Sequence, residues 1–183
     1  MLEVNFSPFP VIRTERLLLR SMALTDAPEI LFLRADERVM KYIDRERLKS
    51  LQEAETFIQG ILNSVAANEN ILWAISLLEE PGKLIGNIGF WRMKLQHYRA
   101  EVGYMLHPDF WNKGIMKEAL LAAVEFGFNN IKLHSIEAHI NPENKASGIL
   151  LEKSGFTREA YFKEDYYFKG KFLDTAIYSL LCK

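Results

Sequence analysis

Residues 108–119, Pro-Asp-Phe-Trp-Asn-Lys-Gly-Ile-Met-Lys-Glu-Ala, join a strand-like run at 101–107 to a helical pattern at 115–130. A glycine at such a junction, here Gly114, lets the backbone bend so that successive N–H groups point at one spot. The positive end of the helix dipole adds to their effect. The stretch therefore predicts a seat for a phosphate or pyrophosphate, although glycines at strand–helix junctions also serve as plain connections.

Composition narrows the class of protein. The 183 residues suit one domain, and 49% hydrophobic with 26% charged residues is ordinary for a globular protein. A net charge of −1 gives no basic surface for nucleic acid. The single Cys182 excludes an internal disulfide framework, and neither a membrane-length apolar run nor a signal-peptide pattern is present. We expect a cytoplasmic protein that binds neither nucleic acid nor membranes.

Hydrophobic spacing and turn residues predict alternating strands and helices on both sides of this stretch. The expected strands are 13–20, 71–78, 84–93, 99–107, 133–140, 157–165 and 167–181, the last two turning near Gly170. The expected helices are 25–35, one that begins at 51 behind a capping box, 115–130, and one capped by Asn141 and stopped by Gly155. Gly86 and Gly89 indicate a bulge or a close approach of backbones.

Two side chains fall where chemistry is plausible. Alternation along 99–107 places Glu101 on one face of its strand and Tyr104 on the other, so a carboxylate is aimed from an otherwise apolar strand beside the anion seat. On the last helix Asn144 and Ser147 share a face. Glu118 is expected on the outer side of the helix that follows Gly114.

Four blocks, residues 14–20, 100–104, 111–119 and 141–156, resemble the GNAT superfamily of acyl-CoA N-acyltransferases. The chain is most similar to the ribosomal-protein alanine/serine N-acetyltransferase branch. The resemblance implies one α/β (mixed α+β) domain over 1–183, a twisted mixed sheet of about seven strands flanked by about four helices. The neighbouring parallel strands 99–107 and 133–140 would splay and admit the pantetheine arm of acetyl-CoA between them.

The resemblance also implies the cofactor contacts. Backbone of residues 105–107 would pair with the pantetheine amides, the turn 111–116 would hold the pyrophosphate, and Asn144 would lie near the pantetheine end. The residues so assigned are Met105, Leu106, His107, Trp111, Asn112, Lys113, Gly114, Ile115, Met116 and Asn144. The chain departs from the superfamily at Trp111, usually Arg or Gln, as many members of this branch do. It departs from the branch at Asn112 (usually Gly) and Met116 (usually small), which implies an intact but tighter or differently shaped phosphate site.

Acetyl transfer by direct attack needs a base for the amine and a proton for the thiolate. We expect Glu101 to act as the base through water, with substrate orientation or a simple ion pair to Arg92 or Arg99 as the alternative. Ser147 would protonate the thiolate, because the tyrosine used in other branches falls at 151–152, where neither residue can serve; its alternative is helix packing or capping. Cys182 is expected to be structural rather than nucleophilic.

No metal is expected. His134 and His139 are five residues apart on a strand, hence on opposite faces, and no cysteine or helical histidine accompanies them. The favoured acceptor is a protein N-terminal amine of the ribosomal-protein type. The alternatives are a polyamine or aminoglycoside acceptor, or a non-catalytic acyl-CoA-binding module. We expect the first two helices and residues 159–174 to build the acceptor groove, and the final hairpin to support a homodimer.

Overall fold

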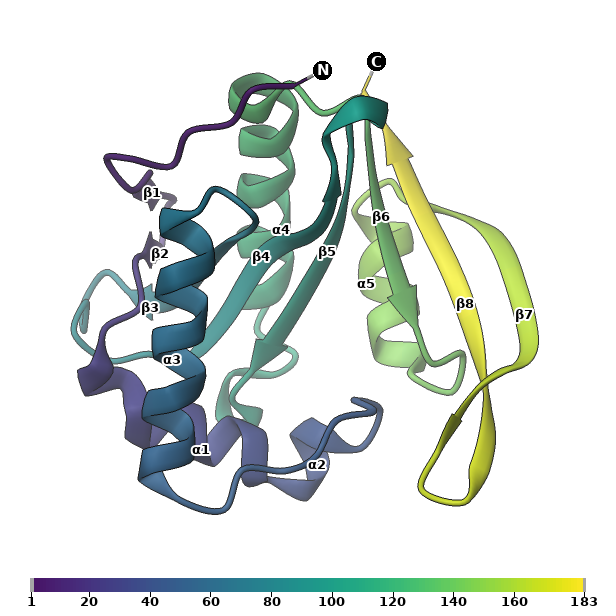
Figure 1. The fold of residues 1–183 in the computed structure, drawn as a ribbon, viewed down its shortest axis with the longest axis horizontal. Coiled ribbons are helices and arrows are strands. Elements are labelled where there is room, and N and C mark those ends of the chain that lie inside the picture. The colour runs from purple at the N-terminus through teal and green to yellow at the C-terminus, as the bar shows by residue number, and fades with distance from the viewer. Residues whose placement is uncertain (1, 183) are drawn as a thin grey trace.

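One mixed sheet runs through the molecule, in the strand order β1-β2-β3-β4-β5-β6-β8-β7 (Figure 1). The structure is a computed structural model, and residues 2–182 of the chain are described. Within them the strands are β1 (Ile12–Arg13), β2 (Leu17–Arg20), β3 (Ile71–Leu77), β4 (Gly86–Lys94), β5 (Arg99–Leu106), β6 (Ser135–Ile140), β7 (Thr157–Phe168) and β8 (Lys171–Leu181). Neighbouring strands are antiparallel except β5 and β6, which are parallel.

Helices cover both faces of this sheet. The α-helices of residues 2–182 are α1 (Ala27–Ala35), α2 (Glu37–Met40), α3 (Leu51–Ala66), α4 (Ile115–Phe126) and α5 (Lys145–Lys153). Helices α1 and α3 pack against one face, and α4 and α5 lie on the other (Figure 1). None of the helices described combines the length and hydropathy needed to span a bilayer.

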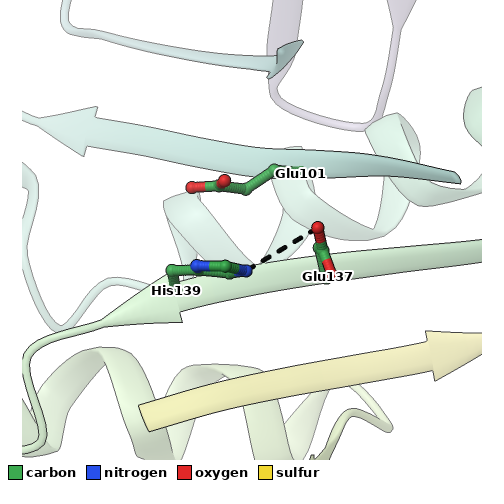
Figure 2. Close-up of side chains that lie close together, drawn as sticks. All are labelled: Glu101, Glu137 and His139. Carbon is green, nitrogen blue, oxygen red and sulfur yellow. Dashed lines mark ion pairs between the residues drawn. The ribbon is translucent and has the colours of Figure 1, made fainter. Parts of the chain in front are cut away.

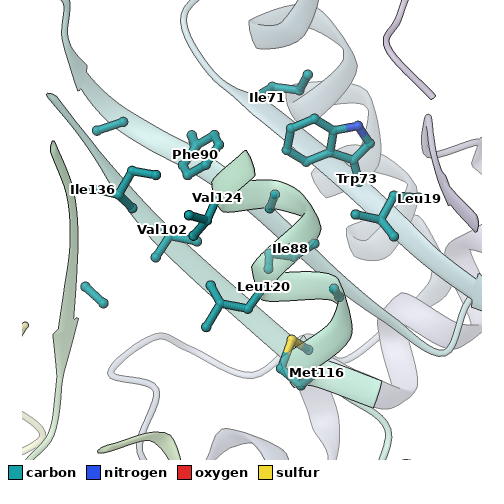
Figure 3. Close-up of a cluster of buried hydrophobic side chains, with 14 of the residues drawn as sticks. Leu19, Ile71, Trp73, Ile88, Phe90, Val102, Met116, Leu120, Val124 and Ile136 are labelled. Atoms are coloured by element: carbon teal, nitrogen blue, oxygen red, sulfur yellow. The ribbon is translucent and has the colours of Figure 1, made fainter. Parts of the chain in front are cut away.

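The buried side chains alternate between these two layers. In β3, Ile71 and Trp73 belong to the cluster under α4, whereas Leu72 belongs to the cluster under α1 and α3. Figure 3 shows Leu120 and Val124 of α4 lying over the sheet. Because β3 is central and packed on both faces, it reads as a continuous apolar run rather than a strict alternation.

The predicted strand 13–20 is wrong in one respect, because it is two strands joined by a turn. Thr14 closes that turn: its N–H donates to the Leu17 carbonyl at 3.0 Å, and its Oγ1 accepts from the Leu17 N–H at 3.0 Å. A threonine that bonds its own neighbourhood competes with the ladder. The extra short strand and the one-turn helix α2 raise the totals from about seven and about four to eight strands and five helices in the part described.

Helix starts were predicted with mixed success. Ser50 caps α3 as expected, its hydroxyl accepting from the Glu53 N–H. Asn141 is not the cap of α5: its Oδ1 accepts from the Glu143 N–H in a separate turn, and the helix begins behind Asn144. The Asn-Pro pair thus makes a turn before the helix instead of its first turn.

The last two strands are divided at a different point than predicted: β7 runs to Phe168 instead of 165, and β8 begins at Lys171 instead of 167. β7 continues through Tyr167, and the reversal occurs at Gly170, whose φ is +82°. β7 is the outer strand of the sheet and mostly exposed. The surface expected to support a homodimer is therefore accessible on this chain, and dimer formation stays a prediction.

Candidate active site

The parallel strands β5 and β6 pair over three positions and then part. The paired residues are Arg99 with Ser135, Ala100 with Ile136, and Glu101 with Glu137. Beyond the last pair the strands diverge (Figure 1). The prediction that these two strands are parallel neighbours is therefore confirmed. After Glu101, the backbone N–H and C=O groups on the facing edges of β5 and β6 no longer pair with each other.

The released edge of β5 carries the backbone of Leu106. The His107 N–H donates to the Ile85 carbonyl at 2.8 Å. The backbone N–H and C=O groups of His107 and, by alternation, of Met105 therefore point toward β4. Those of Leu106 point the other way. The indole Nε1 of Trp111 donates to the Leu106 carbonyl at 2.8 Å. Of the three residues expected to pair with pantetheine, Leu106 has the backbone orientation that suits it.

The turn after β5 has the shape expected of an anion seat. Gly114 is the N-cap of α4 with φ +75°, and Asn112 also lies in the left-handed region with φ +59°. Ile115 and Met116 are buried at 4% and 8% exposure, so they can offer backbone N–H groups and not side chains. The residues predicted for pyrophosphate are thus brought together at a helix N-terminus, and phosphate binding there stays a prediction.

Ser147 lies inside a short hydrogen-bonded chain between α5 and β5. The Asn144 side chain caps α5 by accepting from the Ser147 N–H at 3.1 Å. The Ser147 hydroxyl, in a residue 7% exposed, is hydrogen-bonded to the Tyr104 hydroxyl at 2.6 Å. The sequence placed Tyr104 on the face opposite Glu101 but did not indicate this contact across 43 residues.

Tyr104 is suited to hold a proton rather than to remove one. Burial raises the pKa of Tyr104 to about 12, even though the hydrogen bond with Ser147 acts in the opposite direction. Its hydroxyl therefore stays protonated over the whole range in which enzymes are assayed. Together the two hydroxyls form a partly buried proton-donating pair on the α5 side of the sheet.

Glu101 is buried on the opposite face, with neighbours that the sequence did not group. Figure 2 shows Glu101 beside Glu137 and His139 from β6. One oxygen or nitrogen of each side chain lies within 4.8 Å of the others. Glu101 accepts from Arg92 at 2.9 Å, which confirms the ion pair offered as one alternative for it. His139, with 29% of its side chain exposed, connects the pair of carboxylates to solvent.

These three side chains are also ligand types that metals use. Each carboxylate, however, already has cationic partners: Arg92 for Glu101, and Arg99 at 2.7 Å with Lys94 at 3.6 Å for Glu137. A divalent cation would have to enter among these positive charges, which repel it. The charges around the cluster therefore agree with the expectation of no metal, which stays a prediction.

One of the two walls expected for an acceptor groove, residues 159–174, contacts the segment that connects the helices expected to form the other wall. Tyr166 of β7 donates to Asp44, in the segment after α2, and Lys169 pairs with Glu46 at 3.2 Å. Burial raises the pKa of Asp44. Residues far apart in sequence thus join the final hairpin to the connection between α2 and α3.

Comparison with known proteins identifies the family to which the chain belongs. Residues 16–157 match the acetyltransferase (GNAT) domain family. The uncharacterised N-acetyltransferase YoaA of Bacillus subtilis is 33% identical over 173 residues, 94% of this chain and 97% of the relative. The crystal structure of a GNAT-family acetyltransferase from Bacillus anthracis has a TM-score of 0.83 at 32% identity, covering 94% of this chain and 98% of that one.

Two further similar proteins have an acceptor in their names. The ribosomal protein uS5-alanine N-acetyltransferase of Escherichia coli is 35% identical over 79 residues, 43% of this chain and 41% of the relative. The spermidine N-acetyltransferase of Vibrio cholerae, whose structure contains CoA and spermine, shares the fold with a TM-score of 0.80 at 23% identity. It covers 92% of this chain and 96% of that one.

Proposed function

Because the chain belongs to the GNAT acetyltransferase family and is an N-acetyltransferase, we propose that it moves the acetyl group of acetyl-CoA to a primary amine by direct attack. One observation carries the proposal. Where β5 and β6 part, a buried carboxylate, Glu101, lies on one face of the sheet and the hydroxyl pair of Ser147 and Tyr104 lies on the other. A thioester between the strands would have a proton acceptor on one side and proton donors on the other.

The proposed reaction needs a proton acceptor for the amine and a proton donor for the thiolate. The protonated amine first loses a proton to Glu101, directly or through water, and its nitrogen lone pair then attacks the thioester carbonyl. As the C–N bond forms and the C–S bond breaks, the thiolate takes a proton from Ser147. Ser147 regains a proton from solvent by relay through the Tyr104 hydroxyl, so both hydroxyls end protonated. The nitrogen gives up its second proton when the amide forms, so the net result is amide, free CoA thiol and one proton released.

We propose a protein N-terminal amine as the acceptor. Support comes from the resemblance of the four sequence blocks to the ribosomal-protein branch, and from the similarity to the uS5-alanine enzyme. A polyamine is the second candidate, favoured by the shared fold with a spermidine enzyme. The side chains paired with Glu101 and Glu137 are cationic, namely Arg92, Lys94 and Arg99. These positive charges would repel a polycation such as spermidine more than a peptide that carries a single N-terminal charge.

Release of free thiol from acetyl-CoA tests the proposal directly. The purified chain should release CoA thiol when given N-terminal peptides of ribosomal proteins, and much more slowly with spermidine or an aminoglycoside. Mass spectrometry of the peptide should place the acetyl group on the α-amine. Turnover confined to spermidine would replace the acceptor proposed here, and absence of turnover with every amine despite CoA binding would contradict the catalytic role.

Ser147→Ala should lower kcat about tenfold to a hundredfold and leave the KM for acetyl-CoA nearly unchanged, because the hydroxyl is needed only once the thiolate forms. Tyr104→Phe removes the second member of the pair and should lower kcat in the same direction. The double variant should be little worse than Ser147→Ala alone, because the two groups act in series. Multiplicative losses would instead mean that the hydroxyls act independently.

A further inference from the structure

The turn between β1 and β2 is tied to the first turn of α4. The Glu118 carboxylate accepts hydrogen bonds from Thr14 Oγ1 at 2.6 Å, from the Arg16 backbone N–H at 2.9 Å and from Arg16 Nε at 2.7 Å. Its side chain is 18% exposed. Glu118 lies outside the buried stripe of α4, as predicted, but it is not simply solvated, because a turn about a hundred residues earlier in the chain partly covers it.

Arg16 has a second attachment, inside the anion seat itself. Its Nη1 donates to the backbone carbonyl of Lys113 at 3.0 Å. Its Nη2 lies 3.5 Å from where a Cβ would stand on Gly114. The planar guanidinium therefore bridges the first turn of α4 and the peptide between Lys113 and Gly114, which is where the left-handed N-cap residue turns the chain into the helix.

The position of Glu118 poses an electrostatic problem for a phosphate site. A carboxylate in the first turn of a helix is held by the positive dipole end, so it competes with any phosphate bound there. Burial would raise the pKa of Glu118, but the hydrogen bonds from Thr14 and Arg16 together hold it below its ordinary value. The group is thus a full negative charge at neutral pH, and Arg16 is the cation that offsets it.

We propose that Arg16 is a positioning residue of the CoA phosphate site, which holds the Lys113–Gly114 peptide in place and neutralises Glu118. The inference rests on the proposed function, because the phosphate in question is that of acetyl-CoA. It gives a physical role to the Thr14-Glu15-Arg16 block, which the catalytic scheme does not use.

Binding of CoA and of pantetheine to the full chain, measured by calorimetry, separates this role from a general loosening of the site. Pantetheine lacks the phosphates. Arg16→Ala should weaken CoA binding about tenfold to a hundredfold, the effect of losing hydrogen bonds to a charged group, and leave pantetheine binding unchanged. Arg13→Ala, an exposed charge change on β1, is the matched control and should alter neither.

Two more variants separate the effect of the Arg16 charge from that of its hydrogen-bonding geometry. Arg16→Lys keeps the charge but lacks a fork that reaches both Glu118 and the Lys113 carbonyl, so it should bind CoA nearly as weakly as Arg16→Ala. Adding Glu118→Gln to Arg16→Ala should recover only part of the affinity, because the unpaired carboxylate is removed while the Lys113 carbonyl still lacks its partner. Melting temperatures of all variants, recorded without ligand, show that each is folded.

The possible failures are distinct. A wild-type chain that does not bind CoA would overturn the proposed function and this inference together. A wild-type chain that binds CoA, with Arg16→Ala binding it equally well, would overturn this inference alone. Equal losses for CoA and pantetheine would make Arg16 a general structural residue, and full rescue by Arg16→Lys would make its charge, rather than its geometry, the operative feature.

Discussion

Glu101→Gln is expected to lower kcat/KM at neutral pH about a hundredfold to a thousandfold, the contribution typical of a positioned general base. The substitution keeps the shape of the side chain and an oxygen that can accept from Arg92. Because 59% of the Arg92 side chain is exposed, its guanidinium stays hydrated when the opposite charge is lost, and folding should be little affected. The loss is therefore expected in the chemistry and not in the yield of folded protein.

The dependence of that loss on pH separates a base from a residue that only orients the amine. An α-amine has a pKa of about 8, so the fraction of amine that is already unprotonated in solution rises between about pH 7 and about pH 9. The deficit of Glu101→Gln should shrink over that range if Glu101 is the base. A deficit that is constant with pH and appears in the KM for the amine would assign Glu101 to substrate orientation.

Arg92→Gln is the matched control for the ion pair. It removes the partner of Glu101 without touching the carboxylate, so it should retain most of the activity. If Arg92→Gln instead reproduces the full loss of Glu101→Gln, the ion pair itself is what matters, and the carboxylate is not acting alone as the base. Glu137 and His139 lie close enough to share its proton, so His139→Gln is expected to have a smaller effect that grows at low buffer concentration.

Local patterns predicted the parts of the fold that depend on a few consecutive residues. The cap at Ser50, the stop at Gly155 and the sharp turn at Gly114 each depend on neighbours within four residues, and each was found. The capping box is only half formed, because the Glu53 carboxylate accepts from the Lys49 N–H and not from the Ser50 N–H. The cap of α5 was misplaced by three residues because Asn141 and Asn144 are the same residue type, and the choice between them depends on how the chain leaves β6.

The contacts that turn these elements into a site are not local. Glu101 meets Glu137 because β5 and β6 pair in one particular register, and a single-residue shift would have turned one of the two away. Alternation predicted which face each strand residue occupies but not which residue stands opposite. The Tyr104–Ser147 and Arg16–Glu118 bonds were missed for the same reason, since they connect elements whose docking is set by the whole core.

The glycines of β4 were predicted to mark a bulge or a close approach, and the structure separates the two. The irregularity in the β4–β5 ladder lies between Trp91 and Lys94, not at a glycine. Both glycines are sites of close approach, and a Cβ on Gly86 would lie 2.5 Å from the Met105 carbonyl oxygen. The tighter site is Gly89, where a Cβ would lie 2.2 Å from the Ile71 carbonyl oxygen and 2.7 Å from the Leu72 Cα. Both are backbone atoms of the neighbouring central strand, which cannot move aside as a side chain can.

Gly89→Ala should therefore destabilise the fold by about 3 kcal/mol, at the upper end of what overpacking costs, because β3 and β4 must shift apart in the middle of the sheet. Gly60→Ala is the matched control: nothing lies within 4 Å of the added Cβ on α3, so it should stabilise by about 0.5–1 kcal/mol through helix propensity. Urea unfolding followed by circular dichroism measures both. Equal midpoints for Gly89→Ala and wild type would show that the central strands yield to a methyl group. The separation of β5 and β6, which begins one strand away, would then be adjustable too rather than fixed by the rigidity of the sheet beside it.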